Sequence, residues 1–283
     1  MVDIVRRRVD IEFDSDSASG WLPGEPIVET FLDTISFFFP AGEKFFIDSV
    51  SHYKDAIRDE DLKIQVRSFI YQEAMHTSVH KRCNTALLAI YPDGWMVDRL
   101  GHAVLNGFRM VSPVSFQLAI SCAIEHFTAI LADSLFHYLD YILERAHPDF
   151  AMLWAWHAVE ETEHKAVCFD VYQEQIGRGP VAYLMRILAM LLVTVLGVLV
   201  ISAGVLLVRR NKRRSQPIQP VVMAPNLKAN TASLVSSLIP WRLYLDYYKP
   251  SFHPWNHDNS QSIEDWKQRF PGFGVSSDFK SGR

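Results

Sequence analysis

The chain has 283 residues, of which 49% are hydrophobic and 12% aromatic, so it can bury the core of one large domain, alone or with an appendage. A formal net charge of −4 and an isoelectric point near 6.3 give no reason to expect nucleic acid as a partner. The three cysteines have no paired spacing, which favours a reducing compartment and argues against a disulfide scaffold or a zinc–thiolate site.

Residues 1–28 predict an extended lead-in, because a weakly alternating segment is followed by turn-forming residues, and we expect little chemistry there. No apolar run follows the basic residues near the start, so no signal peptide is expected. A helical pattern begins at Ile27. The segment 40–42 (PAG) should kink or restart this helix immediately before Glu43, although two short helices meeting at a turn are an alternative.

Residues 59–90 predict one long helix, with acidic residues at its positive N-terminal end and a stop at residues 91–94 (YPDG). The stripe expected to face inward mixes apolar residues with acids and histidines: Leu62, Val66, Phe69, Ile70, Glu73, Met75, His76, Val79 and His80. Residues 95–112 are amphipathic but less regular, so they predict part of a crossover connection.

Two further helices are expected. Pro113 can open a third helix that runs through Glu125 to about Arg145. A break at residues 147–149 then precedes a fourth helix, which carries the segment 154–172 (WAWHAVEETEHKAVCFDVY) and ends near residues 177–180.

The second and fourth predicted helices each carry a Glu-x-x-His pair, a spacing that places both side chains on one helix face within reach of one metal ion. The first and third each carry a lone glutamate in an apolar neighbourhood. One Glu from each of two helices and Glu-x-x-His from each of the other two is the ligand pattern of di-iron and di-manganese carboxylate bundles. The candidate ligands are Glu43, Glu73, His76, Glu125, Glu161 and His164.

The separations between these residues agree with such a bundle. Glu43 and Glu73 are 30 residues apart and Glu125 and Glu161 are 36 apart, which suits antiparallel neighbours, whereas the 52 residues from Glu73 to Glu125 require a long connection. A ferritin-like bundle has its single long crossover at that place. The sequence therefore predicts an all-α, ferritin-like four-helix bundle over residues 29–180.

Other polar residues near the motifs have open roles. His157, one turn before Glu161, and His80 are candidates for an extra ligand or a proton donor, with a supporting or core role as the alternative. Glu160 could replace Glu161 in a frame with His164 at i+4, although only Glu161 repeats the spacing of the first pair. The remaining expectations are His126 on a different face, Glu163 and Lys165 facing solvent, and Cys122 and Cys168 in the core.

Residues 187–208 form a run of 22 residues without a charge, and a basic cluster (RRNKRR) follows at once. Because about 20 apolar residues are enough to cross a bilayer, residues 181–214 predict a membrane-associated helix with a basic flank, and a buried fifth bundle helix is the alternative. A basic flank is ordinarily cytoplasmic, so a simple span would place the helical domain outside. A re-entrant or surface-lying helix, or an orientation set by the folded domain, would remove that conflict.

Residues 215–283 predict a C-terminal tail with a Pro-rich linker and short helices near residues 231–238 and 241–248. We expect this tail to pack on the bundle or on the membrane surface, because Tyr248, Trp255 and the two neighbouring histidines suit either place. One of them, His253, is not favoured as a metal ligand.

The motifs PAGEKFF, QEAMH, AIEHF, WHAVEETEHKAVCFDVY and FHPW resemble a bacterial family of predicted metal-dependent hydrolases, which is similar to the ferritin-like di-iron carboxylate proteins. The resemblance extends from about residue 28 to residue 258. It implies metal ligation by the six candidate ligands. The hydrophobic segment departs from ordinary soluble ferritin-like enzymes and argues against a small soluble substrate.

Four carboxylates and two imidazoles suit two metal ions, with iron favoured and manganese or zinc as alternatives. Glu73 and Glu161 are expected to bridge them, with Glu43 and Glu125 as terminal ligands. The leading hypothesis is a membrane-associated, non-haem di-iron oxygenase or oxidase. The alternatives are a binuclear metal-dependent hydrolase and a non-enzymatic metal-binding bundle.

The expected partners are membrane lipid and an apolar or aromatic small-molecule substrate, held by Phe69, Phe127, Trp154 and Trp156. The expected location is the bacterial inner membrane with the active domain in the cytoplasm. A homodimer is left open.

Overall fold

The computed structural model describes residues 2–215 and 240–275, and within these ranges the regular secondary structure is entirely helical. The all-α prediction is thereby confirmed, whereas the ferritin-like relationship stays a prediction. The tail helix expected near residues 231–238 lies outside the described residues.

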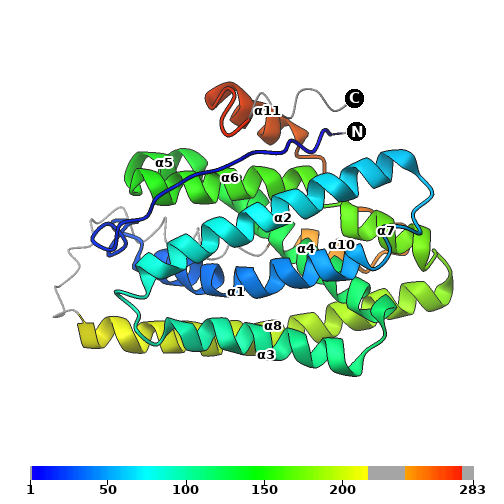
Figure 1. The fold of residues 1–283 in the computed structure, drawn as a ribbon, viewed down its shortest axis with the longest axis horizontal. Coiled ribbons are helices and arrows are strands. Elements are labelled where there is room, and N and C mark those ends of the chain that lie inside the picture. The colour runs from blue at the N-terminus through cyan, green and yellow to red at the C-terminus, as the bar shows by residue number, and fades with distance from the viewer. Residues whose placement is uncertain (1, 216–239, 276–283) are drawn as a thin grey trace.

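The helices that carry the candidate ligands pack against one another in a bundle. They are α1 (Pro26–Ser51), α2 (Glu60–Leu87), α4 (Val114–His137) and α6 (Pro148–His164), which α7 (Val167–Gln175) continues after a short break. Between α2 and α4, helix α3 (Gly94–Val111) carries the chain back along the length of the bundle (Figure 1). The long connection inferred from the ligand spacing is therefore this helical crossover.

The start of α2 follows directly from its sequence. The Asp59 side chain accepts hydrogen bonds from the backbone nitrogens of Asp61 and Leu62, at 2.9 and 3.0 Å. Those N–H groups have no partner inside the helix, so an N-terminal aspartate stabilises it by about 1 kcal/mol.

The predicted restart of the first helix at Pro40 is wrong, because α1 continues through it to Ser51. A proline within a helix has no N–H for the carbonyl four residues earlier, here that of Ser36. Asn84 of α2 donates its Nδ2 to this carbonyl oxygen at 2.9 Å. A neighbouring helix therefore supplies the hydrogen bond that the proline removes.

Two predicted helices are divided in the structure. The third ends at His137, and the short helix α5 (Leu139–Arg145) follows it. The fourth is broken between α6 and α7, at Lys165 and Ala166. The Lys165 ammonium is directed at the C-terminal tail, where it donates to the carbonyl oxygen of His257 at 2.6 Å.

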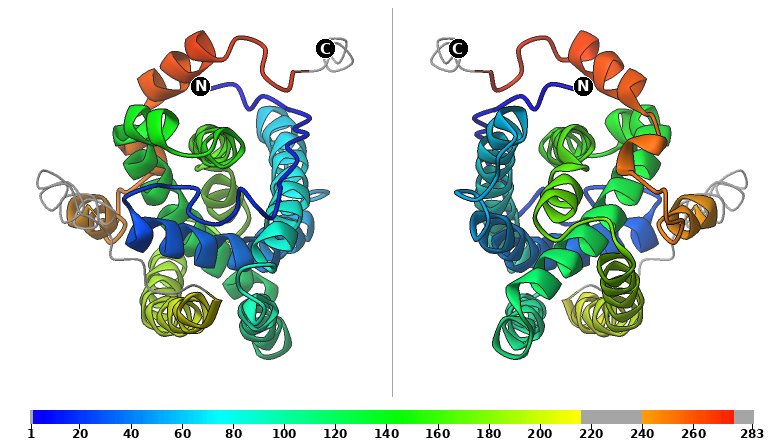
Figure 2. Two further views of the ribbon diagram at one scale, coloured as in Figure 1. Left: turned by 90° about the vertical axis from the view of Figure 1, so that its left-hand side faces the viewer. Right: turned by 90° about the vertical axis from the view of Figure 1, so that its right-hand side faces the viewer.

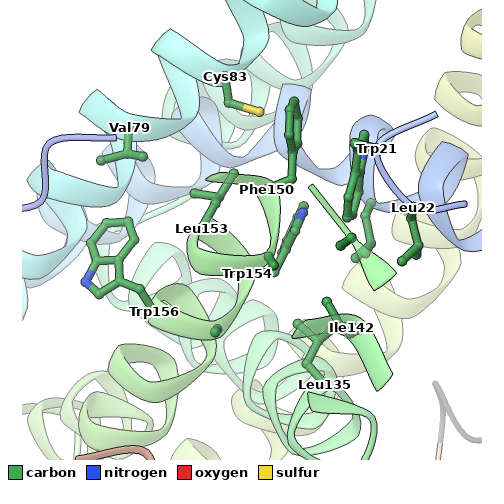
Figure 3. Close-up of a cluster of buried hydrophobic side chains, with 14 of the residues drawn as sticks. Trp21, Leu22, Val79, Cys83, Leu135, Ile142, Phe150, Leu153, Trp154 and Trp156 are labelled. Carbon is green, nitrogen blue, oxygen red and sulfur yellow. The ribbon is translucent and has the colours of Figure 1, made fainter. Parts of the chain in front are cut away.

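Two apolar cores lie on either side of the polar residues of the bundle. Figure 3 shows the first core, in which Trp21 of the lead-in stacks on Phe150 of α6 with ring centroids 5.1 Å apart. On α1, Phe39 belongs to this core and Phe45 to the second, with Glu43 between them. On α2 the second core likewise precedes Glu73 and the first core follows His76, so the polar site has apolar packing on both sides along these two helices.

Helix α8 (Pro180–Ser215) lies lengthwise on the bundle and contacts α1, α3 and α4 (Figure 1). The tail returns through α10 (Trp241–Asp246) and α11 (Ser260–Arg269), and α11 packs on α6. In Figure 2, α3 and α8 project from one side of the bundle, whereas α11 and the N-terminal segment lie on the opposite side.

Two glycines of α8 provide a matched test of this packing. A Cβ on Gly204 would lie 2.8 Å from Thr34 Cγ2 and 2.9 Å from the Phe38 ring, whereas a Cβ on Gly197 would meet nothing within 4 Å. We expect Gly197→Ala to raise the stability by up to about 1 kcal/mol through helix propensity. Gly204→Ala should lower it by about 1 to 3 kcal/mol through overpacking.

Thermal unfolding of the two variants in the same detergent measures the difference. Equal melting temperatures would show that α8 does not approach α1 at Gly204.

Candidate metal centre

The structure brings the side chains of the six candidate ligands to one place inside the bundle, each no more than 2% exposed. His164 Nε2 lies 3.0 Å from Glu73 Oε1, 3.6 Å from Glu161 Oε2 and 3.8 Å from Glu125 Oε2. His76 Nδ1 lies 3.6 Å from Glu161 Oε1 and 3.9 Å from Glu73 Oε1. Each Glu-x-x-His pair therefore faces the glutamate of the other.

Two overlapping triads have ligand atoms within 4.8 Å of one another. One triad consists of Glu43, Glu73 and His76, and the other of Glu73, Glu161 and His164. Glu73 belongs to both, which is the position that the bridging prediction requires. Glu125 joins neither triad and borders the second through its contact with His164.

His157 and His80 belong to the same cluster. His157 forms a triad with His76 and Glu161, and a second triad with His80 and Glu43. Its Nε2 atom lies 3.1 Å from Glu161 Oε1. The cluster therefore contains four imidazoles beside the carboxylates, two more than the ligand pattern required.

The donor atoms fit bound cations. Both carboxylate oxygens of Glu43, Glu73 and Glu125 are buried without a hydrogen bond of acceptable geometry, and so are His76 Nδ1, His157 Nε2 and His164 Nε2. Unpaired buried polar groups are costly, and converging carboxylates also repel one another. Divalent cations would satisfy these atoms together, because every one of them can act as a ligand.

The protonation equilibria show the same excess of negative charge. Burial and repulsion by neighbouring glutamates raise the pKa of Glu43 and Glu125 well above the usual value, and burial raises that of Glu73 to about 7. Burial would also raise the pKa of Glu161, but His164 and His157 outweigh it and hold this pKa well below the usual value. Without metal, the protein therefore keeps protons among its carboxylates near neutral pH.

Neighbouring side chains fix which nitrogen of each histidine carries its proton. Gln72 donates its Nε2 to Val5 O and to Glu163 Oε2, both at 2.9 Å, so its Oε1 can only accept, at 2.8 Å from His164 Nδ1. His164 therefore carries a proton on Nδ1, and its Nε2 is the nitrogen that faces the site and can bind a metal once it has lost its own proton.

The two histidines of α2, His76 and His80, are oriented in the same manner. Glu160 Oε2 accepts from His76 Nε2 at 3.1 Å, which leaves the Nδ1 of that ring for a metal. Ser36 Oγ donates to Asn84 Oδ1 at 2.7 Å, so it accepts from His80 Nδ1 at 2.9 Å. The Nε2 lone pair of His80 then accepts from His157 Nδ1 at 3.0 Å.

Arg7, in the lead-in, binds both Glu160 and Glu163, although little chemistry was expected of that segment. Its Nη1 donates to Glu160 Oε1 at 3.0 Å and its Nη2 to Glu163 Oε1 at 2.7 Å, with all three side chains no more than 2% exposed. Through Glu160 it orients His76, and through Glu163 and Gln72 it orients His164. In the sequence, the only indication of this role is that Arg7 is a charged residue at a position of the alternating segment where an apolar residue would face inward.

Two residues expected to face solvent are buried, and that prediction is wrong. Glu163 faces the Arg7 guanidinium. Lys165 donates to Asn259 Oδ1 at 2.7 Å and lies 4.0 Å from the centroid of the Trp255 ring. Both partners come from distant parts of the chain, so the local helical pattern could not reveal them.

Several other residues lie where they were expected, or apart from the site. His126 faces away and bonds Leu243 O at 3.0 Å, and His253 bonds Asp170 at 2.9 Å. Phe127, an expected substrate contact, instead stacks on Tyr244. Cys122 and Cys168 are buried, as predicted.

The family known by the description "Predicted metal-dependent hydrolase" matches residues 5–258, and the chain belongs to this family. The match covers the lead-in that carries Arg7, all the ligand-bearing helices, α8 and α10. Comparison with curated proteins and with solved structures yields no match.

Removal of the Arg7 charge should lower both the stability of the protein and its metal content, although Arg7 is not a proposed ligand. Arg7→Met leaves two buried carboxylates without their cation, which we expect to cost about 3 to 5 kcal/mol of stability and to lower the bound metal. Arg8→Met is the control, because that neighbouring side chain is exposed. Denaturant unfolding and metal content measure both effects, and equal behaviour of the two variants would contradict this role of Arg7.

Metal affinity should rise with pH. The pKa of Glu73 is about 7 without metal, and a ligand carboxylate has to lose its proton before it binds. For each ligand that must lose a proton, the metal affinity falls about tenfold for every pH unit below the pKa of that ligand. The affinity at pH 6 should therefore be at least about tenfold lower than at pH 8. Competition with a chromophoric chelator at the two pH values tests this, and equal affinities would contradict it.

Proposed function

We propose that the chain is a metal-dependent hydrolase with a dinuclear centre. The observation that carries the proposal is the convergence of buried donor atoms that lack hydrogen bonds, in a chain whose family is described as metal-dependent hydrolases. The proposed ligands are Glu43, Glu73, His76, Glu125, Glu161 and His164, with Glu73 and Glu161 as bridges. Carboxylate and imidazole donors suit iron, manganese or zinc.

Bound divalent ions would supply Lewis acidity and lower the pKa of a water molecule, so that hydroxide is available as a nucleophile near neutral pH. The residues of the chain would hold the ions, orient the reacting groups and accept the released proton. We assign proton acceptance to the Nε2 atom of His157, which lies 3.1 Å from Glu161 Oε1, while its Nδ1 lies 3.0 Å from His80 Nε2. Burial holds the pKa of His80 well below its usual value, so this ring stays neutral and its Nε2 lone pair orients His157 by accepting from Nδ1.

Aromatic side chains surround the histidines and keep water from them. Phe39 lies 4.4 Å from the His157 ring, Phe69 lies 4.9 Å from that of His164, and Trp156 lies 4.9 Å from that of His76, as distances between ring centroids. This lining favours an apolar or aromatic substrate, because such walls offer few polar partners.

A second function, a di-iron oxygenase or oxidase, is favoured by the enclosure of the site. The ligand side chains are at most 2% exposed, so an ester or amide could reach them only if the bundle opened. Dioxygen is much smaller and could enter through lesser fluctuations. The same carboxylate and imidazole donors suit a pair of iron ions.

We also propose that the enzyme works at a membrane. Within residues 2–215 and 240–275, two helices are apolar and long enough to cross one, α4 and the segment Pro180–Arg210 of α8. In their most apolar windows α4 is 56% buried, as a core helix of the bundle would be, but α8 is only 11% buried. The exposed apolar surface of α8 therefore supports contact with lipid, as in a protein at the bacterial inner membrane with its active domain in the cytoplasm.

Turnover under two conditions tests the proposed reaction. Protein loaded with zinc or manganese should hydrolyse apolar esters, amides or phosphoesters without oxygen. Oxygen uptake by the reduced iron-loaded protein, with no anaerobic hydrolysis, would instead support the oxygenase.

The variant Glu73→Gln should lose most bound metal and all turnover, because it removes the charge of the proposed bridge at nearly constant volume. Glu60→Gln, at an exposed position on the same helix, should change neither. Full metal content in Glu73→Gln would exclude this centre.

A further inference from the structure

Helices α3 and α8 lie on one side of the bundle (Figure 2), and both carry exposed apolar side chains. We call their combined surface the α3–α8 face and define it by the exposed apolar side chains of the two helices. They are Trp95, Met96, Met110, Val111, Val181, Leu184, Leu188, Leu191, Val195, Val198, Leu199 and Leu206. On α8 most of them recur every three or four residues, so they form one stripe along the helix.

This face is much more apolar than the surface of a water-soluble monomer. Val181 is 75% exposed and Leu206 is 67% exposed, and no charged residue lies between Arg186 and Arg209. Large contiguous apolar patches mark binding surfaces for protein or membrane. Beside α8, the short helix α10 adds Trp241 and Leu245, which are also exposed.

Helix α8 is held against the bundle at both ends and between them. Tyr172 of α7 donates its hydroxyl to Ala182 O at 2.6 Å, and Thr194 Oγ1 lies 2.9 Å from the Tyr244 hydroxyl. Near the C-terminal end, Gly204 permits close approach to Phe38 of α1. Helix α8 could span a bilayer only if these contacts broke or if the bundle entered the bilayer together with it.

An upright α8 would place polar neighbours in the hydrocarbon layer. Helix α3 runs beside α8 and carries the half-exposed pair Asp98 and His102, with Arg99 exposed beside them. Tyr244 bonds Thr194, which lies within the charge-free run. Charges are costly at the centre of a bilayer, whereas tyrosine and tryptophan favour its interface.

We propose that the α3–α8 face lies flat on a lipid bilayer, with α8 parallel to the membrane plane and its stripe in contact with the acyl chains. This inference rests on the proposed membrane association and specifies its geometry. The polar residues of α3 and Tyr244 of α10 then lie at headgroup level. Arg209 and Arg210 lie beyond the apolar stripe, where they can bind lipid phosphate.

The flat orientation also places the site close to lipid. Phe38 of α1 faces α8 at Gly204, and the next residue, Phe39, contacts the His157 ring. A single helix, α1, therefore separates the lipid-facing helix from the proposed proton acceptor, His157. A substrate dissolved in the bilayer would have a short path to the site.

Depth measurements on the full chain test this geometry. Nitroxide labels on Leu184→Cys, Val195→Cys and Leu206→Cys report lipid contact through collisions with oxygen and with a water-soluble nickel chelate. Labelling is selective because Cys83, Cys122 and Cys168 are buried. Gln268→Cys on the opposite side is the aqueous control, and the vesicles contain phosphatidylcholine and phosphatidylglycerol.

A flat helix should give the three stripe positions equal depths just below the phosphates, with the control in water. The labels at Leu184 and Val195 are 11 residues apart, so a spanning helix would separate them by about 16 Å along its axis. Such a difference would overturn the flat orientation but leave the membrane association intact.

Vesicle flotation of the unlabelled chain is measured first. A chain that does not float would overturn the membrane association itself. Floating protein whose stripe labels touch neither lipid nor water would show that a second copy covers the face. That outcome would also overturn the proposal.

Discussion

The rest of the structure depends on the repulsion among glutamates buried in one bundle. Glu43, Glu73, Glu125 and Glu161 converge at its centre, and the side chains of Glu160 and Glu163 are buried just outside them. Helix propensity and apolar packing can fold this chain only if the charges are neutralised, because each unpaired buried carboxylate would otherwise take up a proton or oppose folding. Arg7 compensates the outer pair. Of the inner four, Glu161 is stabilised by His164 and His157, whereas Glu43, Glu73 and Glu125 need protons or metal ions, which couples the stability of the bundle to its proposed cofactor.

That requirement explains why so much of the structure surrounds the centre. The two apolar cores close it at both ends, and Gln72, Glu160 and the pair formed by Ser36 and Asn84 determine which histidine nitrogens face it. Asn84 also completes α1 at its proline, so one amide supports both a helix and a ring orientation. Such outer contacts typically affect metal affinity by 10- to 100-fold. Through Arg7 the lead-in therefore acts as part of the site, although it contributes none of the proposed ligands.

The polar interior and the apolar exterior are related through α1. One face of this helix carries Glu43 and Phe39 toward the site, and another carries Thr34 and Phe38 toward α8. A soluble bundle would cover α8 or make it polar. Here the most apolar part of α8 is only 11% buried, which agrees with the proposal that an apolar substrate reaches the site from lipid. The hydrolase and oxygenase proposals share this geometry and differ in what reacts at the centre.

The sequence by itself determined the helices and the candidate ligands, because both depend on local geometry. An i to i+3 spacing sets Glu73 beside His76 in any helix, and the ligand spacing predicted the long crossover that α3 forms. Only the tertiary structure decided the partners of Arg7, the burial of Glu163 and Lys165, and the unbroken course of α1 through Pro40. Each of these depends on an atom supplied from far along the chain, such as the Asn84 amide or the His257 carbonyl. Local periodicity can predict a helix face, but it cannot predict which distant group will meet it.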